Sequence, residues 1–172
     1  MVHAATPLGS GYGATRFSSP EDAFKVIYAA ENLTTALAET VVRDRFQAKA
    51  RRGLHEDELA LWGAASIDAQ HSLTLIDLRT TGLLRLGVST DAARAKVHAQ
   101  GRKLSQALHD QTDIDGVVYA SRLTGANCIC VYERATAKLR ASPVAPLPSL
   151  AGLIEALRTL SVTIAPSGPS SP

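Results

Sequence analysis

Apolar residues recur along the chain with two different spacings, which together predict a mixture of strands and helices. Runs rich in β-branched and aromatic residues predict strands at residues 24–29, 72–78, 116–121 and 128–133. Apolar residues three and four positions apart predict helices at residues 32–48, 56–63, 91–109 and 150–160. We therefore expect an α+β fold: a single domain with a small, twisted, mixed β-sheet core flanked by helices.

Individual residues within these elements carry further expectations. Asn32 or Thr34 can cap the first helix, and Glu39 lies at the edge of the apolar arc of that helix. The single tryptophan, Trp62, is expected to turn toward the core. Gly101 has no side chain, so it permits another element to approach its helix closely.

Composition narrows the class of protein. The 172 residues fit one domain, and 45% apolar with 20% charged residues is ordinary for a globular protein. A net charge of +2 without a basic run gives no reason to expect direct nucleic-acid binding. The sequence has no signal peptide and no apolar run of about 18 residues, so we expect a cytoplasmic protein without a membrane partner.

The two cysteines and the five histidines do not predict a metal site. Cys128 and Cys130 point to the same face of a predicted strand, and no histidines are paired at metal-ligand spacing. We expect both thiols to be small, buried, apolar residues, which is consistent with a reducing compartment.

Five residues, three from two short stretches near the N-terminus and two from a later strand-like run, could together handle a dinucleotide. Arg16 follows a Gly-rich stretch that is expected to form a mobile or ligand-covering loop, and its guanidinium can bind paired phosphate oxygens. Tyr28 can stack on a planar base. Glu39 can stabilise a sugar cation as a glycosidic bond breaks. Ser121 and Arg122 end a predicted strand about eighty residues later.

Each of these residues also has an ordinary structural explanation. Arg16 and Arg122 are compatible with exposed surface arginines, and Tyr28 with a buried structural tyrosine. Glu39 is four residues before Arg43, which is the spacing of an exposed helical ion pair worth about 0.2–0.5 kcal/mol.

The order and context of these residues resemble the RES domain, a family named for its Arg, Glu and Ser. The resemblance is carried by Thr15–Phe17, Val26–Ala30, Ala36–Glu39 and Asp115–Ser121, and it covers roughly residues 2 to 135. It predicts a RES-like, NAD-cleaving domain over residues 1–165. The Pro/Ser/Gly composition of residues 166–172 predicts a disordered tail after it. Such domains commonly begin with another strand, which we expect to be shortened or missing here.

The resemblance also implies a function. RES-domain proteins are toxins of bacterial toxin–antitoxin pairs, usually neutralised by an Xre-type antitoxin, and their fold resembles that of ADP-ribosyltransferases. They consume NAD as a substrate, with no prosthetic group, and release nicotinamide. By position, Arg16, Glu39 and Ser121 match the naming residues and Tyr28 matches the accompanying aromatic residue.

From this resemblance we expect specific roles and partners. Glu39 is the candidate for stabilising the sugar cation, Arg16 for clamping the pyrophosphate, and Tyr28 for stacking near the nicotinamide. Ser121 would contact the ribose or position Glu39, and Arg122 would be a second phosphate contact. An antitoxin is the expected protein partner, and self-association within a toxin–antitoxin complex is compatible with the apolar helices.

Two other functions remain open from the sequence. A protein ADP-ribosyltransferase toxin would use the same residues with a macromolecular acceptor. A non-catalytic binding protein would keep a degenerate pocket, and the amphipathic stretch Leu150–Leu160 would pack on its partner.

Overall fold

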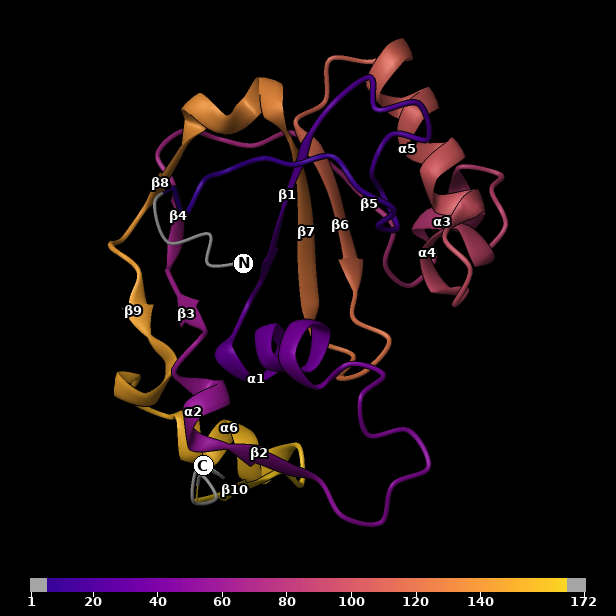
Figure 1. Ribbon diagram of the computed structural model, residues 1–172. Helices are drawn as coiled ribbons and strands as arrows, with labels where there is room; N and C mark the ends of the chain where they lie inside the picture. The colour runs from indigo at the N-terminus through magenta and orange to yellow at the C-terminus, as the bar shows by residue number, and fades with distance from the viewer. Residues whose placement is uncertain (1–5, 167–172) are drawn as a thin grey trace.

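The main sheet has four strands in the order β1-β7-β6-β5 (Figure 1). They are β1 (Val26–Ala30), β7 (Asn127–Tyr132), β6 (Gly116–Ala120) and β5 (Leu75–Asp77) in a computed structural model that describes residues 6–166. β7 pairs antiparallel with β1 and β6, whereas β5 pairs parallel with β6. The predicted small mixed sheet is confirmed, and each predicted strand differs at its ends by no more than three residues.

One face of the sheet is buried under a group of helices. These are α3 (Gly82–Arg85), α4 (Asp91–Arg94) and α5 (Ala99–Gln111), which lie together on one side in Figure 1. Alternate residues of β1, β6 and β7 point to this side because the side-chain period of a strand is two. They form a core cluster with the loop before β1, including Phe17, Val117, Cys128, Cys130 and Tyr132. Both cysteines are buried, as predicted.

The opposite face of the sheet carries a smaller apolar cluster. Ile27 of β1 and Val131 of β7 pack there against Ala135 and Leu139. Ala135 belongs to the 3₁₀-helix η2 (Glu133–Lys138), and Leu139 begins β8 (Leu139–Ala141), which pairs with β4 (Ile67–Ala69). The sheet is thus covered on both faces.

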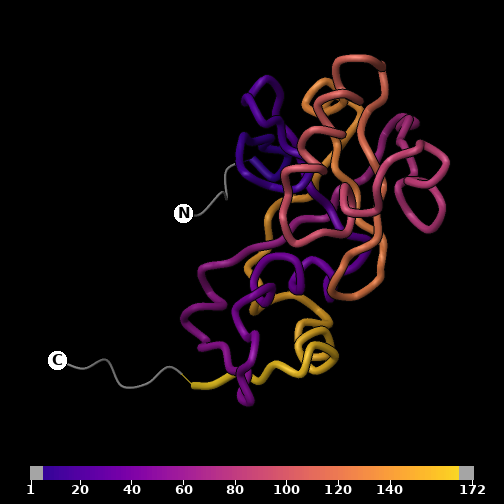
Figure 2. The backbone as a smooth tube through the Cα atoms, turned by 90° about the vertical axis from the view of Figure 1, so that its right-hand side faces the viewer, coloured from indigo at the N-terminus to yellow at the C-terminus, as the bar shows by residue number. Residues whose placement is uncertain are grey.

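A third apolar cluster, the C-terminal cluster, lies at the end of the molecule where the described chain finishes (Figures 1 and 2). It joins the helices α1 (Leu33–Leu37), η1 (Ala38–Val42), α2 (Glu56–Leu59) and α6 (Leu153–Thr159). Around it lie η3 (Leu147–Ser149), the pair β2 (Gly53–His55) and β10 (Thr163–Ala165), and the pair β3 (Gly63–Ala64) and β9 (Ala145–Pro146). Leu153, Ala156 and Leu157 are buried in this cluster, so the apolar face of α6 packs within the chain.

The first helix is shorter than predicted. Asn32 caps it as expected, because its Oδ1 accepts a hydrogen bond from the Thr35 N–H at 2.8 Å. The helix then continues as the π-helix η1 and ends at Val42, not near residue 48. Arg43 has φ 27°, a value that helices do not allow. The turns that follow place Phe46 in the C-terminal cluster.

The helix predicted over residues 91–109 is two helices. Ala95, between α4 and α5, has extended backbone, and its carbonyl accepts a hydrogen bond from the Arg16 side chain. This long-range contact cannot be read from local spacing. Val97, which lies just before α5, is 72% exposed.

The prediction that Trp62 turns toward the core is also wrong. α2 ends at Leu59, and Trp62 lies before β3 with 41% of its surface exposed, so it does not enter the core. Its carbonyl accepts a hydrogen bond from the Leu147 N–H, which continues the pairing of β3 with β9.

The expected changes at both ends of the chain are not tested. The shortened first strand falls on residues 1–5, and the predicted tail, apart from Pro166, falls on residues 167–172; both segments lie outside the described residues. Within residues 6–166, no helix is long and apolar enough to cross a membrane.

Candidate active site

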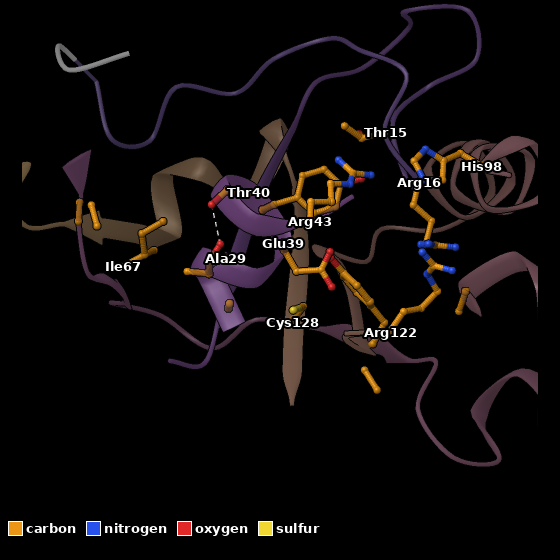
Figure 3. Close-up of a pocket in the computed structure, with 18 residues that line it drawn as sticks. Thr15, Arg16, Ala29, Glu39, Thr40, Arg43, Ile67, His98, Arg122 and Cys128 are labelled. Carbon is orange, nitrogen blue, oxygen red and sulfur yellow. Dashed lines mark hydrogen bonds between the residues drawn. The ribbon is translucent and has the colours of Figure 1, made fainter. Parts of the chain in front are cut away.

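A cavity of about 390 Å³ opens where the strands of the main sheet meet η1 (Figure 3). Its volume lies at the lower end of the range for small-molecule sites. Four of the five predicted site residues line it: Arg16, Tyr28, Glu39 and Arg122. The fifth, Ser121, lies directly behind Glu39 and contacts its carboxylate. The fold therefore brings together residues that are more than a hundred positions apart.

Glu39 is held by Ser121, which is 4% exposed. The Ser121 hydroxyl donates a hydrogen bond to Glu39 Oε1 at 2.6 Å. Its oxygen accepts hydrogen bonds from the Leu123 and Thr124 N–H groups at 3.1 and 3.2 Å. These two donors occupy the lone pairs of the hydroxyl, so its proton is directed at Glu39. This geometry makes Ser121 suited to orienting the carboxylate, not to acting as a nucleophile.

Glu39 does not pair with Arg43. Within residues 6–166 no ion pair joins these side chains, because the π-helical turn ends at Val42 and Arg43 leaves the helix with φ 27°. π-helical turns are rare and frequently occur at functional sites. Both charged groups consequently line the cavity separately.

Tyr28 lines the cavity and also fixes the chain beside Arg16. Its hydroxyl oxygen accepts a hydrogen bond from the Phe17 N–H at 2.8 Å. Burial, followed by the neighbouring Cys130, raises the pKa of Tyr28 well above its usual value. The phenol therefore stays neutral and keeps its role as an acceptor at physiological pH.

Helix α5 holds the same loop from the other side. The Ser105 hydroxyl donates to the Phe17 carbonyl at 2.6 Å, and Arg102 Nη2 donates to the Ser19 carbonyl at 2.6 Å. Gly101 faces Arg16 so closely that a Cβ atom there would lie 2.6 Å from the Arg16 carbonyl oxygen. The predicted close approach at Gly101 is confirmed.

Arg16 and Arg122 form a pair of like charges at one side of the cavity. Their guanidinium groups approach each other in Figure 3, and Arg16 Nη1 also donates to the Ala95 carbonyl at 2.5 Å. Burial, and then the charge of Arg122, lower the pKa of Arg16. Within the described part of the chain Arg122 makes no hydrogen bond or ion pair. Two facing guanidinium groups are an arrangement that an anion between them would stabilise.

The comparison with known families decides which family this site belongs to. The sequence model of the RES domain matches residues 2–151, which is most of the chain. The chain belongs to the RES domain family. The position of the Arg, Glu and Ser residues around one cavity agrees with this assignment.

This RES domain is similar to one bacterial protein in sequence and to another in fold. It is 41% identical over 92 residues to the probable toxin y4kH of Sinorhizobium fredii, covering 52% of this chain and 72% of the relative. Its fold is similar to a chain in the crystal structure of the M. tuberculosis MbcT–MbcA toxin–antitoxin complex. That match has a TM-score of 0.57 and 20% identity, covering 79% of this chain and 75% of that chain.

The cavity of the RES domain includes residues that sequence reasoning did not select. The polar ones are Thr15, Thr40, Arg43, His98 and Tyr119. Arg43 was considered only as a helical partner of Glu39, and His98 was expected inside a continuous helix. No local sequence pattern predicts either position. Arg43 reaches the cavity because the π-helix ends just before it, and His98 reaches it because the predicted helix is broken before α5.

Cys128 forms part of the cavity wall but is a poor nucleophile. Burial, together with the charge of Glu39, raises the pKa of its thiol to about 11, so the thiolate is scarce at neutral pH. No group of three or more His, Cys, Asp or Glu residues that could hold a metal ion occurs among residues 6–166. The cavity of the RES domain therefore offers one carboxylate, two phenols, three guanidinium groups, one imidazole, two threonine hydroxyls and one thiol from its own residues.

Proposed function

We propose that this chain is the toxin of a toxin–antitoxin system and that it cleaves NAD at the bond between nicotinamide and ribose. The observation that carries the proposal is a single oriented carboxylate, Glu39, sharing one cavity with the facing pair Arg16 and Arg122. The relative in S. fredii is named a probable toxin, and the similar solved structure is a toxin–antitoxin complex.

Glu39 supplies the electrostatic part of the reaction. Breaking the nicotinamide–ribose bond leaves an oxocarbenium-like sugar whose positive charge is spread over the anomeric carbon and the ring oxygen. A carboxylate that is already oriented stabilises this charge without reorganising during the reaction. Ser121 provides this orientation through its 2.6 Å hydrogen bond to Oε1. The second carboxylate oxygen is left for the sugar.

The arginine pair supplies the binding part. The diphosphate of NAD lies between Arg16 and Arg122, where its negative charge relieves the repulsion of the two guanidinium groups. Tyr28 fixes the Arg16 loop through the Phe17 N–H and presents its ring to the cavity, where it shields the reacting sugar from water.

The nicotinamide occupies the part of the cavity on the other side of Glu39. Ala29 and Ile67 lie there in Figure 3. These apolar side chains can contact a flat ring, and they carry no charge that would compete for the departing neutral nicotinamide. NAD is thus placed with its nicotinamide ring, its reacting ribose and its diphosphate in order along the cavity.

Release of nicotinamide from NAD tests the proposed function. The purified chain is incubated with NAD, and nicotinamide and ADP-ribose products are followed in buffers with and without phosphate. We propose water or phosphate as the acceptor, so free ADP-ribose or its 1-phosphate accumulates in step with nicotinamide. An intact NAD pool after prolonged incubation of folded protein contradicts the proposal and favours a non-catalytic binding protein.

A parallel arm tests protein ADP-ribosylation. NAD labelled in its adenylate half is incubated with the chain and a bacterial lysate, and protein-bound label is measured. The proposal predicts that the label stays in small molecules. Label recovered in protein, in proportion to released nicotinamide, would instead make the chain a protein ADP-ribosyltransferase toxin.

We also propose an Xre-type antitoxin as the protein partner, acting by blocking access to the cavity. Titrating the antitoxin into the chain is then expected to abolish nicotinamide release at the stoichiometry of the complex. A stable complex that still cleaves NAD at the rate of the free chain contradicts this mode of inhibition.

A further inference from the structure

We propose that His98 is a ligand-binding residue that accepts a hydrogen bond from the adenosine half of the substrate. This inference rests on the proposed function, because it takes NAD as the molecule in the cavity. It extends that function by assigning a residue to the half of NAD that does not react.

The hydrogen bond of the His98 ring fixes which of its nitrogen atoms faces a ligand. Nδ1 lies 2.9 Å from the Ala14 carbonyl oxygen, and a carbonyl can only accept. Nδ1 therefore carries a proton, and in the neutral ring Nε2 carries the lone pair. Because the ring is half-buried and lines the cavity, Nε2 is the atom left for a hydroxyl or amino group of a ligand.

The place of His98 along the cavity points to the adenosine half. In Figure 3, Glu39 lies near the centre, the guanidinium groups of Arg16 and Arg122 lie to one side, and His98 lies on that same side, beside Arg16. With the reacting ribose at Glu39 and the diphosphate between the arginines, the next group along NAD is the adenosine ribose. Its hydroxyl groups and the adenine amino group are donors that match the Nε2 acceptor.

A purely structural role for His98 is the competing explanation. The bond to Ala14 holds the chain two residues before Arg16, and its loss could displace the guanidinium. However, the same loop is already held at Phe17 by Tyr28 and Ser105, and at Ser19 by Arg102. The two roles use different ring nitrogens, so substitutions can separate them.

Two substitutions and two ligands make the test. His98→Asn keeps an N–H group near the position of Nδ1 and removes Nε2, whereas His98→Gln keeps an amide near Nε2 and removes the Nδ1 donor. ADP and inorganic diphosphate differ only by adenosine, and neither is consumed. Their dissociation constants are measured by calorimetry for the wild-type chain, both variants and the exposed control His71→Asn.

His98→Asn is expected to weaken ADP binding about five- to tenfold, the effect of one lost hydrogen bond, and to change diphosphate binding less than twofold. His98→Gln should retain more ADP affinity than His98→Asn, and His71→Asn should match the wild-type chain. Wild-type ADP affinity in His98→Asn, or an equal loss for ADP and diphosphate, overturns the inference. So does a wild-type chain that does not bind ADP.

The proposed function is tested on the same protein preparation by nicotinamide release. A chain that binds ADP through His98 but leaves NAD intact would refute the proposed cleavage and keep the adenosine contact. If the wild-type chain cleaves NAD and His98→Asn binds ADP with unchanged affinity, the proposed cleavage is kept and the adenosine contact of His98 is refuted.

Discussion

Single hydrogen bonds around Glu39 determine how the carboxylate is presented to the cavity. Ser121 is buried, and its hydroxyl accepts two backbone N–H groups while donating to Glu39. The bond between Ser121 and Glu39 joins residues that are 82 positions apart in the sequence. The contact links the end of β6 to η1, so that sheet and helix hold the acid together.

Ser121→Ala removes the donor that orients Glu39 and keeps the cavity residues. We expect kcat for nicotinamide release to fall about tenfold with KM nearly unchanged, because the lost interaction matters most as charge develops on the sugar. Steady-state kinetics against the exposed control Ser72→Ala measure this effect. An unchanged kcat in a folded Ser121→Ala protein means that Ser121 does not position the acid.

Arg16→Lys keeps a positive charge at the cavity but loses the planar fork of donors. We expect KM for NAD to rise about tenfold and kcat to change little, because bidentate phosphate contacts contribute to binding of both ground and transition states. Arg140→Lys, at an exposed position away from the cavity, is the matched control. Equal KM values for both variants count against the diphosphate clamp.

Among the elements, α5 is the one that fixes the loop carrying Arg16. It approaches the loop closely at Gly101 and bonds to it through Ser105 and Arg102. Changing a glycine to alanine in an unobstructed helix interior stabilises the helix by about 1 kcal/mol. At Gly101 the added Cβ would lie 2.5 Å from the Ala92 carbonyl oxygen and 2.6 Å from that of Arg16, so the elements must separate.

Gly101→Ala is therefore expected to lower stability by about 1–3 kcal/mol, opposite in sign to the helix propensity. The displaced loop should also raise KM for NAD. Urea unfolding and steady-state kinetics check both effects. Increased stability with an unchanged KM would show that α5 does not constrain the Arg16 loop.

The sequence predicts those elements whose signals are local. The strand from Gly116 to Ala120 and the cap at Asn32 follow from β-branched residues and from capping chemistry. The break at Ala95, whose carbonyl accepts a hydrogen bond from Arg16, and the π-helical end before Arg43 have no such local signal. The same two events bring His98 and Arg43 to the cavity, so these site residues could not be predicted.

At the scale of the whole molecule, an ion pair between a buried carboxylate and a partly exposed lysine joins the sheet to its covering layer. Asp115 is 4% exposed and precedes β6, and Lys138 Nζ of η2 contacts its carboxylate at 2.8 Å. The Thr74 N–H also donates to it, at 2.7 Å. Burial alone would raise the pKa of Asp115, but the hydrogen bonds from Lys138 and Thr74 outweigh it and lower the pKa.

This pair predicts how stability depends on pH. The lowered pKa means that the unfolded chain binds the Asp115 proton more readily than the folded chain. The contribution to stability is therefore present above the usual pKa of 3.8 and is lost as the pH falls through the lower folded value. Urea midpoints from pH 7 to pH 3 should fall less steeply with acid in Asp115→Asn than in the wild type. Parallel curves would contradict this.

The central claim is that Glu39 acts on the bond between nicotinamide and ribose in a cavity shared with Arg16 and Arg122. Its most direct test compares the initial rates of nicotinamide release from NAD by the wild-type chain and by Glu39→Gln. Equal affinity of the two proteins for ADP is the control that the variant still binds the non-reacting part of the ligand. We predict a fall of at least about a hundredfold in Glu39→Gln with an unchanged urea midpoint. Equal rates in the two folded proteins would contradict the account.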